Sequence, residues 1–129
     1  MSGLRAVGAD ETREVPPCPE GLTPTAQARW AAYWADPISQ YARPIDFHAI
    51  QSWIKLVSEC EELEARLAAT PTVLGARGKP KANPLGQVLR EYRRRVTYYE
   101  RQFGMTPKAR KKLNELTAQL LAAQRALGR

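Results

Sequence analysis

Cationic side chains that could bind phosphate groups are concentrated in the second half of the sequence. Residues 1–70 contain six Lys and Arg and ten Asp and Glu, a net charge of −4, whereas residues 71–129 contain 14 and three, a net charge of +11. Arginine suits phosphate because its planar guanidinium donates two parallel hydrogen bonds. This asymmetry favours an anionic partner, and backbone phosphates would give salt-dependent affinity that is largely independent of base sequence.

We predict that three groups of these cations bind DNA: a Gly- and Pro-rich loop, the outer side of the helix after it, and the first turns of the last helix. The members are Arg77, Lys79 and Lys81; Arg90, Arg93, Arg94 and Arg95; and Lys108, Arg110, Lys111 and Lys112. Arg101 is a further cation on the same helix as the second group. The third group opposes the helix macrodipole, which makes sense where an anion meets the free N–H groups of that end. The alternative is a solvated, charged helix face.

Residues that could catalyse a reaction or bind a metal are sparse. His48 is the only histidine, and Cys18 and Cys60 have no metal-ligand spacing. The glutamates within residues 59–64 fit the solvent face of a helix better than a magnesium site. The stretch "GARGKP" places Pro80 where a Walker motif needs Ser or Thr. We therefore expect no enzymatic activity, no metal and no cofactor.

The sequence shows no pattern typical of a membrane span or a signal peptide. No apolar run approaches the roughly 20 residues that span a bilayer, and the N-terminus lacks the apolar core of a signal peptide. Two cysteines without paired spacing fit a reducing compartment. We expect a soluble, intracellular protein.

Two helices that position the cations begin with the same phrase. "GLTPTA" at residues 21–26 and "GMTPKA" at residues 104–109 share Gly, an apolar residue, Thr, Pro, any residue and Ala. Threonine is a good N-cap and proline fits the first helical position. The phrases predict helices over residues 24–35 and from residue 107 onwards. Recurring capping chemistry and an internal duplication both explain the repeat.

Two longer helices are predicted between these. One begins after Pro44, with Asp46 as its cap and a hydrophobic staple between Ile45 and Ile50, and ends near residue 69. The next begins at an Asn-Pro pair and runs over residues 83–103. Together they predict a long helical hairpin.

Two segments lack a regular pattern. Residues 1–20 carry charges and adjacent prolines with little to bury, so we expect a mobile N-terminal arm. Residues 70–83 contain two Gly, two Pro and three cations, and form a loop longer than most bundle connections. Within it, residues 72–74 are a candidate short strand. A single helical domain is predicted over residues 21–129.

Apolar residues at heptad spacing predict a homo-oligomer. They step by three and four along the second, third and fourth helices, and a long hairpin cannot cover both of its own faces. The predicted interface residues are Trp30, Trp34, Trp53, Leu56, Leu63, Leu67, Tyr92, Val96 and Tyr99. The predicted fold class is all-α, with a long helical hairpin, flanking shorter helices, and oligomerisation through these apolar seams. A monomeric bundle is the alternative.

Three stretches in order resemble the small subunits of tailed-phage terminases: "GLTPTAQARWAAYWADP", "NPLGQVLREYRRRV" and "FGMTPKARKKL". The resemblance covers most of residues 21–113. It implies a ring-forming, non-catalytic adaptor in the host cytoplasm. Such an adaptor recognises double-stranded viral DNA and delivers it to the large subunit, which carries the ATPase and nuclease.

The resemblance also implies roles for single residues. Asn83, Pro84, Gly104, Thr106 and Pro107 match recurring positions that we read as caps and turns, and Arg110 matches a candidate phosphate contact. The last helix is a candidate dock for the large subunit or a neighbouring protomer. A small oligomeric helical transcription regulator, including a helix-turn-helix reader, is the alternative function, and a structural adaptor without DNA binding is a third.

Overall fold

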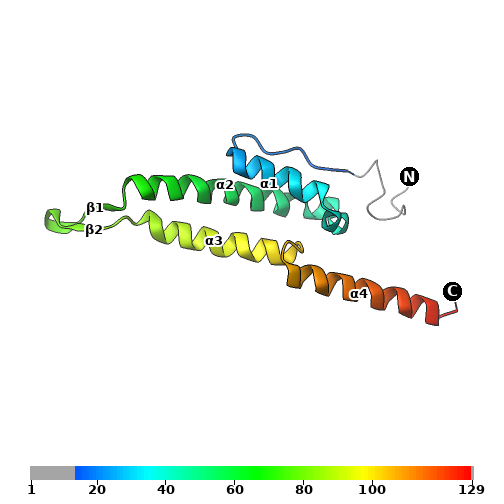
Figure 1. Ribbon diagram of the computed structural model, residues 1–129. Helices are drawn as coiled ribbons and strands as arrows, with labels where there is room; N and C mark the ends of the chain where they lie inside the picture. The colour runs from blue at the N-terminus through cyan, green and yellow to red at the C-terminus, as the bar shows by residue number, and fades with distance from the viewer. Residues whose placement is uncertain (1–13, 129) are drawn as a thin grey trace.

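The computed structural model describes residues 14–128, which form a long helical hairpin with one helix on its side and another beyond its end. The helices are α1 (Pro24–Ala35), α2 (Phe47–Ala69), α3 (Leu85–Gln102) and α4 (Pro107–Ala126), and the strands are β1 (Thr72–Leu74) and β2 (Pro80–Ala82). In Figure 1, α2 and α3 run antiparallel, joined by the β1–β2 hairpin, and α1 lies along α2. The helical class and the long hairpin are confirmed, and so is the short strand at residues 72–74.

The two helix starts with the repeated phrase use the predicted caps. The Thr23 Oγ1 accepts a hydrogen bond from the Ala26 N–H at 3.2 Å, and the Thr106 Oγ1 accepts one from the Ala109 N–H at 3.1 Å. The glycine of each phrase, Gly21 or Gly104, has a positive φ, 79° and 74° respectively. Side-chain capping and a left-handed glycine therefore recur together.

The start of α2 differs from the prediction. The Asp46 Oδ2 accepts a hydrogen bond from the Arg43 N–H at 3.0 Å, which closes a 3₁₀ turn, Pro44–Asp46, instead of capping α2. The predicted staple is wrong because Ile45 is 86% exposed and cannot pack on Ile50. The turn leads straight into the helix, so no extended cap residue intervenes.

Asn83 joins the two ends of the loop between α2 and α3. Its Oδ1 accepts a hydrogen bond from the Leu85 N–H at 3.0 Å, and its Nδ2 donates one to the Thr70 carbonyl at 2.8 Å. The first bond supplies the predicted cap of α3, and the second fixes the loop end beside the end of α2.

The main core lies between α1, α2 and α3. Trp53 is only 1% exposed, and its ring meets the Tyr33 ring edge-on at 5.9 Å between centroids. Its Nε1 donates a hydrogen bond to the Glu100 carboxylate at 3.3 Å, and Arg29 forms an ion pair with the same carboxylate. Glu100 of α3 is therefore the polar link to both α1 and α2.

The residues predicted to face other copies line seams within one chain. Trp30, Trp34, Trp53 and Leu63 are buried in the core of the chain. The remaining five are half-buried, and four of them pack against the same core clusters: Leu67, Tyr92, Val96 and Tyr99, with Leu56 as the fifth. The heptad pattern of α2 is therefore used, at least in part, by its contacts within the same chain, and the interface with other copies stays a prediction.

The last helix is anchored at its start and then leaves the body. Leu113 packs against the main core, and the hydroxyls of Tyr41 and Thr117 lie 3.0 Å apart within hydrogen-bond range. Every residue over 118–128 is exposed. Figure 1 shows α4 extending past the end of the bundle, in roughly the direction of α3, instead of packing across it as in a compact helix-turn-helix unit.

The N-terminal segment is described only from residue 14. Residues 14–20 form neither helix nor strand, and one hydrogen bond ties them to α2: the Gln51 Nε2 donates to the Pro17 carbonyl at 3.2 Å. Residues 1–13 of the predicted mobile arm lie outside the described residues. Among residues 14–128, none of the helices combines the length and the apolar character that crossing a membrane requires.

The repeated phrase offers a matched test of the turn between α3 and α4. A Cβ at Gly104 would lie 2.8 Å from an Ile38 side-chain carbon and 2.9 Å from one of Leu113, whereas a Cβ at Gly21 meets nothing within 4 Å. Both substitutions incur the left-handed cost of roughly 1–2 kcal/mol. We expect Gly104→Ala to lower the free energy of unfolding by about 1–3 kcal/mol more than Gly21→Ala, through overpacking. Urea denaturation followed by circular dichroism measures both, and equal losses would contradict the close packing at this turn.

Candidate nucleic-acid interface

The β1–β2 hairpin carries the first group of predicted cations at its tip. The strands pair antiparallel, with Thr72 opposite Ala82, and the Gly75 N–H donates to the Lys79 carbonyl at 2.7 Å to close the turn. The turn passes through left-handed backbone at Arg77, with φ of 60°. The cations of the hairpin are all exposed: Arg77, Lys79 and Lys81. This short hairpin therefore presents three charges at one end of the molecule.

The three consecutive arginines of α3 are exposed but each has an acidic partner. Arg93 forms an ion pair with Glu64 of α2, and the Glu91 carboxylate lies 2.9 Å from the Arg94 guanidinium and 3.4 Å from that of Arg95. Arg94, through its hydrogen bond and its charge, and then Arg95 hold the pKa of Glu91 below its usual range. Exposed pairs of this kind contribute little to stability because water screens them, so a phosphate can replace the carboxylate as partner.

One face of α3 presents a row of cations. Arg90, Arg94 and Arg101 recur after four and seven residues, which places them on one side of the helix, and all three are exposed. Tyr98 lies beside this row, is 59% exposed, and lines a shallow hollow together with Arg94 and Arg101. An exposed aromatic ring between cations can contact sugar or base as well as phosphate.

A second hollow joins the end of α3 to the start of α4. Arg101, Lys108 and Lys112 line it together with Thr106, and its volume is about 620 Å³. Among residues 14–128, none of these three cations forms an ion pair. We call Arg101, Lys108 and Lys112 the α3–α4 cation cluster. Because no carboxylate among the described residues neutralises these charges, the cluster attracts an anion strongly. The positive end of the α4 dipole increases this attraction.

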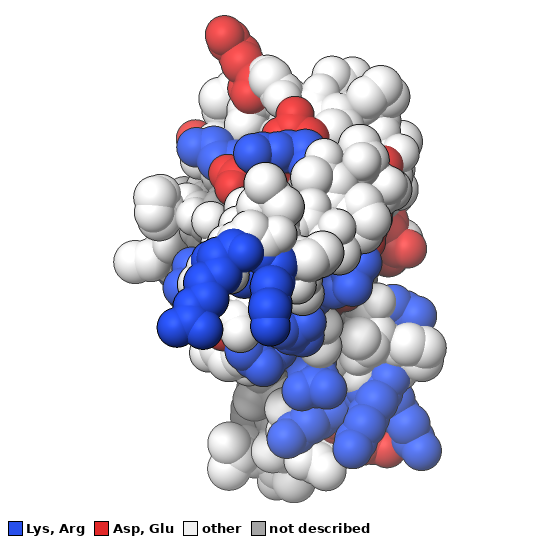
Figure 2. Space-filling model, turned by 90° about the vertical axis from the view of Figure 1, so that its left-hand side faces the viewer, with Lys and Arg blue, Asp and Glu red and all other residues white. Residues whose placement is uncertain are grey.

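Lys and Arg side chains gather on part of the molecular surface (Figure 2). Figure 2, which views the molecule from the hairpin end, shows Lys and Arg over the hairpin and over the lower side formed by α3 and α4. Many of the Asp and Glu side chains in that view lie toward the opposite, upper side. The charge asymmetry of the sequence is thus an asymmetry of surface.

Arg110 is the predicted cation that the structure places elsewhere. Its Nη1 donates a hydrogen bond to the Gly104 carbonyl at 3.4 Å, and its side chain lines a groove with Asp36 and Met105 on the α1 side of the molecule. Arg110 thus supports the turn before α4, and we leave it out of the surface proposed below. Lys111, its neighbour, is exposed.

Two residues of this surface were not among the predicted site residues. Arg101 connects the two hollows, and Tyr98 is the exposed aromatic beside it. The helical spacing of Arg90, Arg94 and Arg101 was a usable signal for the first. No local signal marks Tyr98. Its neighbour Tyr99 has the same side chain but is half-buried and follows the apolar pattern of the helix, so the sequence does not show which tyrosine is exposed.

A second kind of site would be a group of side chains that could hold a metal ion. No three His, Cys, Asp or Glu side chains within residues 14–128 are grouped so that they could hold a metal ion. The surface is suited to binding a polyanion through charge.

The observations so far define a class of protein. It is a small, mostly helical chain with a basic side and an exposed terminal helix. A sequence model of the phage terminase small subunit matches residues 26–119. The chain therefore belongs to the phage terminase small-subunit family, and its role lies in phage genome packaging. This family is generally non-catalytic and works with DNA and a terminase large subunit. Comparisons with curated proteins and with solved structures found no match.

Proposed function

We propose that this chain is a ring-forming, non-catalytic adaptor that binds viral DNA and delivers it to the terminase large subunit. The observation that carries the proposal is the row of cations from the hairpin, along α3, to the α3–α4 cation cluster. It combines with membership of a family that works in genome packaging.

The length of the cation row suits a duplex. The 18 residues of α3 extend over about 27 Å, and phosphates along one strand are spaced about 3.4 Å apart. This length corresponds to the axial rise of roughly eight base pairs, and because each strand winds around the duplex the row can face only the phosphates on its own side. Because it is made of side chains that favour phosphate, we expect affinity to depend strongly on salt and weakly on base sequence.

Salt titration tests the DNA-binding part of this proposal. Duplex DNA is titrated into the protein at several salt concentrations, and the slope of log affinity against log salt counts the phosphates neutralised, at about 0.9 for each. We expect a slope that corresponds to several contacts. Absence of binding even at low salt would refute the proposal and favour a structural adaptor.

The mass of the assembled particle tests the ring. Several copies would bring their cation rows to one DNA molecule, which raises affinity without any new contact. Native mass spectrometry is expected to give a closed oligomer of more than two copies. A stable dimer would instead favour the transcription-regulator alternative.

Glu91 offers a way to strengthen DNA binding. Glu91→Gln removes the charge that holds Arg94 and Arg95, so we expect affinity for duplex DNA to rise by up to about fivefold, the upper worth of such an exposed pair. Glu62→Gln is the matched control, because it makes the same charge change on the exposed side of α2. Fluorescence anisotropy at fixed salt measures both variants. An equal rise in the two would mean that net charge alone, and not the release of these arginines, sets affinity.

A further inference from the structure

The last turns of α4 carry an apolar stripe that nothing in the described chain covers. The stripe continues the heptad positions of Leu113 and consists of Leu116, Leu120 and Ala123. Leu116 is 51% and Leu120 is 60% exposed. A helix of about three turns standing alone in water is only marginally stable, so this segment needs a partner along the stripe.

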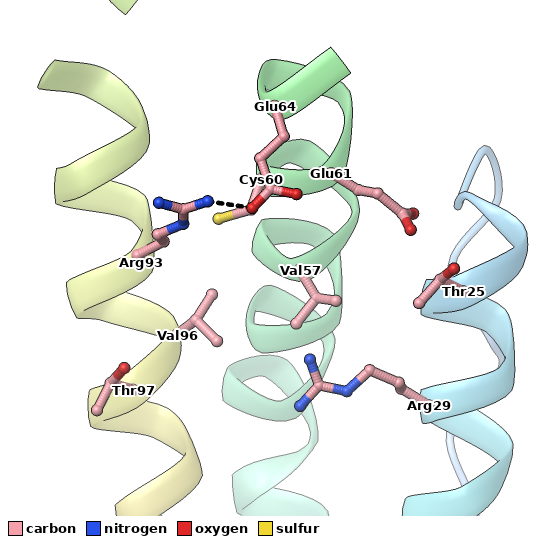
Figure 3. Close-up of a pocket in the computed structure, with 9 residues that line it drawn as sticks. All are labelled: Thr25, Arg29, Val57, Cys60, Glu61, Glu64, Arg93, Val96 and Thr97. Atoms are coloured by element: carbon pink, nitrogen blue, oxygen red, sulfur yellow. Dashed lines mark hydrogen bonds and ion pairs between the residues drawn. The ribbon is translucent and has the colours of Figure 1, made fainter. Parts of the chain in front are cut away.

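The same chain has a groove without an occupant. It lies between α1 and α3 over α2 and has a volume of about 340 Å³. In Figure 3, the side chains of Val57, Cys60 and Val96 lie at its centre. Burial raises the pKa of the Cys60 thiol, so the thiol stays neutral and acts as part of an apolar floor.

Charged and polar groups surround this floor. The Arg93–Glu64 ion pair stands at one end and Arg29 toward the other, as Figure 3 shows. The Thr23 and then the Thr25 hydroxyl hold the pKa of Glu61 below its usual range, so this carboxylate is anionic. The Glu61 side chain lies at the rim of the groove, on the side of α1.

The groove and the stripe match in length and chemistry. Residues 57–64 of α2 extend over about 10 Å, and so do the eight residues from Leu116 to Ala123. The alanine permits close approach, and Gln119 and Gln124 flank the stripe on its two sides. The glutamine amides can meet the polar side chains at the rim of the groove, among them Thr25, Glu61 and Thr97.

From this match we infer that α4 of one copy lies in the α1–α3 groove of the next copy. Figure 1 shows α4 extending away from the helices that form the groove, so a chain cannot fill its own groove with this segment. The contact joins two different surfaces, and repetition of such a contact closes into a ring when the rotation permits. The inference rests on the self-association proposed above and names the surfaces that make it.

Cysteine cross-linking tests the contact directly. In a Cys18→Ser, Cys60→Ala background, Thr97→Cys on the rim of the groove is combined with Gln119→Cys or with Gln124→Cys. Either orientation of α4 places one of these flanks beside α3, so we expect one of the two double variants to form a ladder of covalent oligomers on oxidation. Ala118→Cys with Thr97→Cys is the control, because residue 118 lies on the opposite side of α4.

Two outcomes would overturn the inference. One is the absence of a ladder from both double variants while the native particle mass shows an assembly. The other is covalent dimers from the single Gln124→Cys variant, which would place α4 against α4. If the unmodified protein does not assemble, the proposed ring is contradicted. Native mass spectrometry gives that result before any cross-linking is attempted.

A second measurement does not depend on cysteine. Leu116→Gln combined with Leu120→Gln is expected to reduce the assembled particle to single chains, and Ala118→Gln is expected to leave the particle mass unchanged. Circular dichroism confirms that the body of each variant is folded. Unchanged assembly of the double leucine variant would contradict the inference.

Discussion

Replacing the three residues of the α3–α4 cation cluster by alanine is expected to flatten the salt dependence of DNA binding by about 2.7 in log–log slope. Each phosphate contact contributes about 0.9, and none of the three cations has an acidic partner among residues 14–128. Extrapolated to about 0.15 M salt, this corresponds to a loss of affinity on the order of 100-fold. The variant is Arg101→Ala, Lys108→Ala and Lys112→Ala, titrated with duplex DNA at several salt concentrations.

The control for this variant removes the same number of charges from the other side. Arg43, Lys55 and Arg66 are exposed cations on or next to α2, and among the described residues they form no ion pair. Their triple alanine variant is expected to keep most of the slope. If the two triple variants lose affinity and slope equally, the cluster is not a contact surface and the proposed DNA-binding side is wrong.

Trp53→Ala is expected to have the largest effect on folding, a loss of about 3–5 kcal/mol in the free energy of unfolding. The ring is 1% exposed, meets Tyr33 and lies under the Arg29 guanidinium, and its Nε1 donates to Glu100. Truncation leaves a cavity where α1, α2 and α3 meet and removes one hydrogen-bond partner of the half-buried Glu100 carboxylate. A loss of this size is a large share of the stability of a typical domain.

Urea denaturation at one protein concentration, followed by circular dichroism, measures this loss without relying on tryptophan fluorescence. A fixed concentration is needed because self-association changes apparent stability. Tyr98→Ala is the control, since Tyr98 is exposed and its removal is expected to cost less than about 0.5 kcal/mol. Similar losses for the two variants would contradict the place of Trp53 at the centre of the core.

Local chemistry in the sequence was enough to predict the helices. Thr23 and Thr106 cap α1 and α4 as expected, because a cap depends on residues within one turn of each other. The start of α2 was the exception. There the Asp46 carboxylate turns back to the Arg43 N–H, and both arrangements fit the same short stretch of sequence.

The heptad pattern could not reveal which chain supplies the partner helix. A seam of apolar residues on α2 has the same spacing whether it packs on α3 of its own chain or on a neighbour. The structure assigns Trp53 and Leu63 to the interior of one chain and leaves Leu116 and Leu120 of α4 exposed. We therefore propose the exposed leucines of α4, in addition to the predicted seam residues, as a surface for self-association.

The sequence by itself determined the set of helices, the basic second half of the chain and the family. These depend on caps, periodicity and motifs, which are properties of residues close together in the chain. Tertiary structure decided which cations keep their charge free and which apolar residues stay uncovered. Arg93 meets Glu64 across 29 residues of chain, whereas Arg101 meets no acidic side chain in the described part of the chain. Such pairings depend on how α1, α2 and α3 pack against one another, and local spacing carries no information about contacts between helices far apart in the chain.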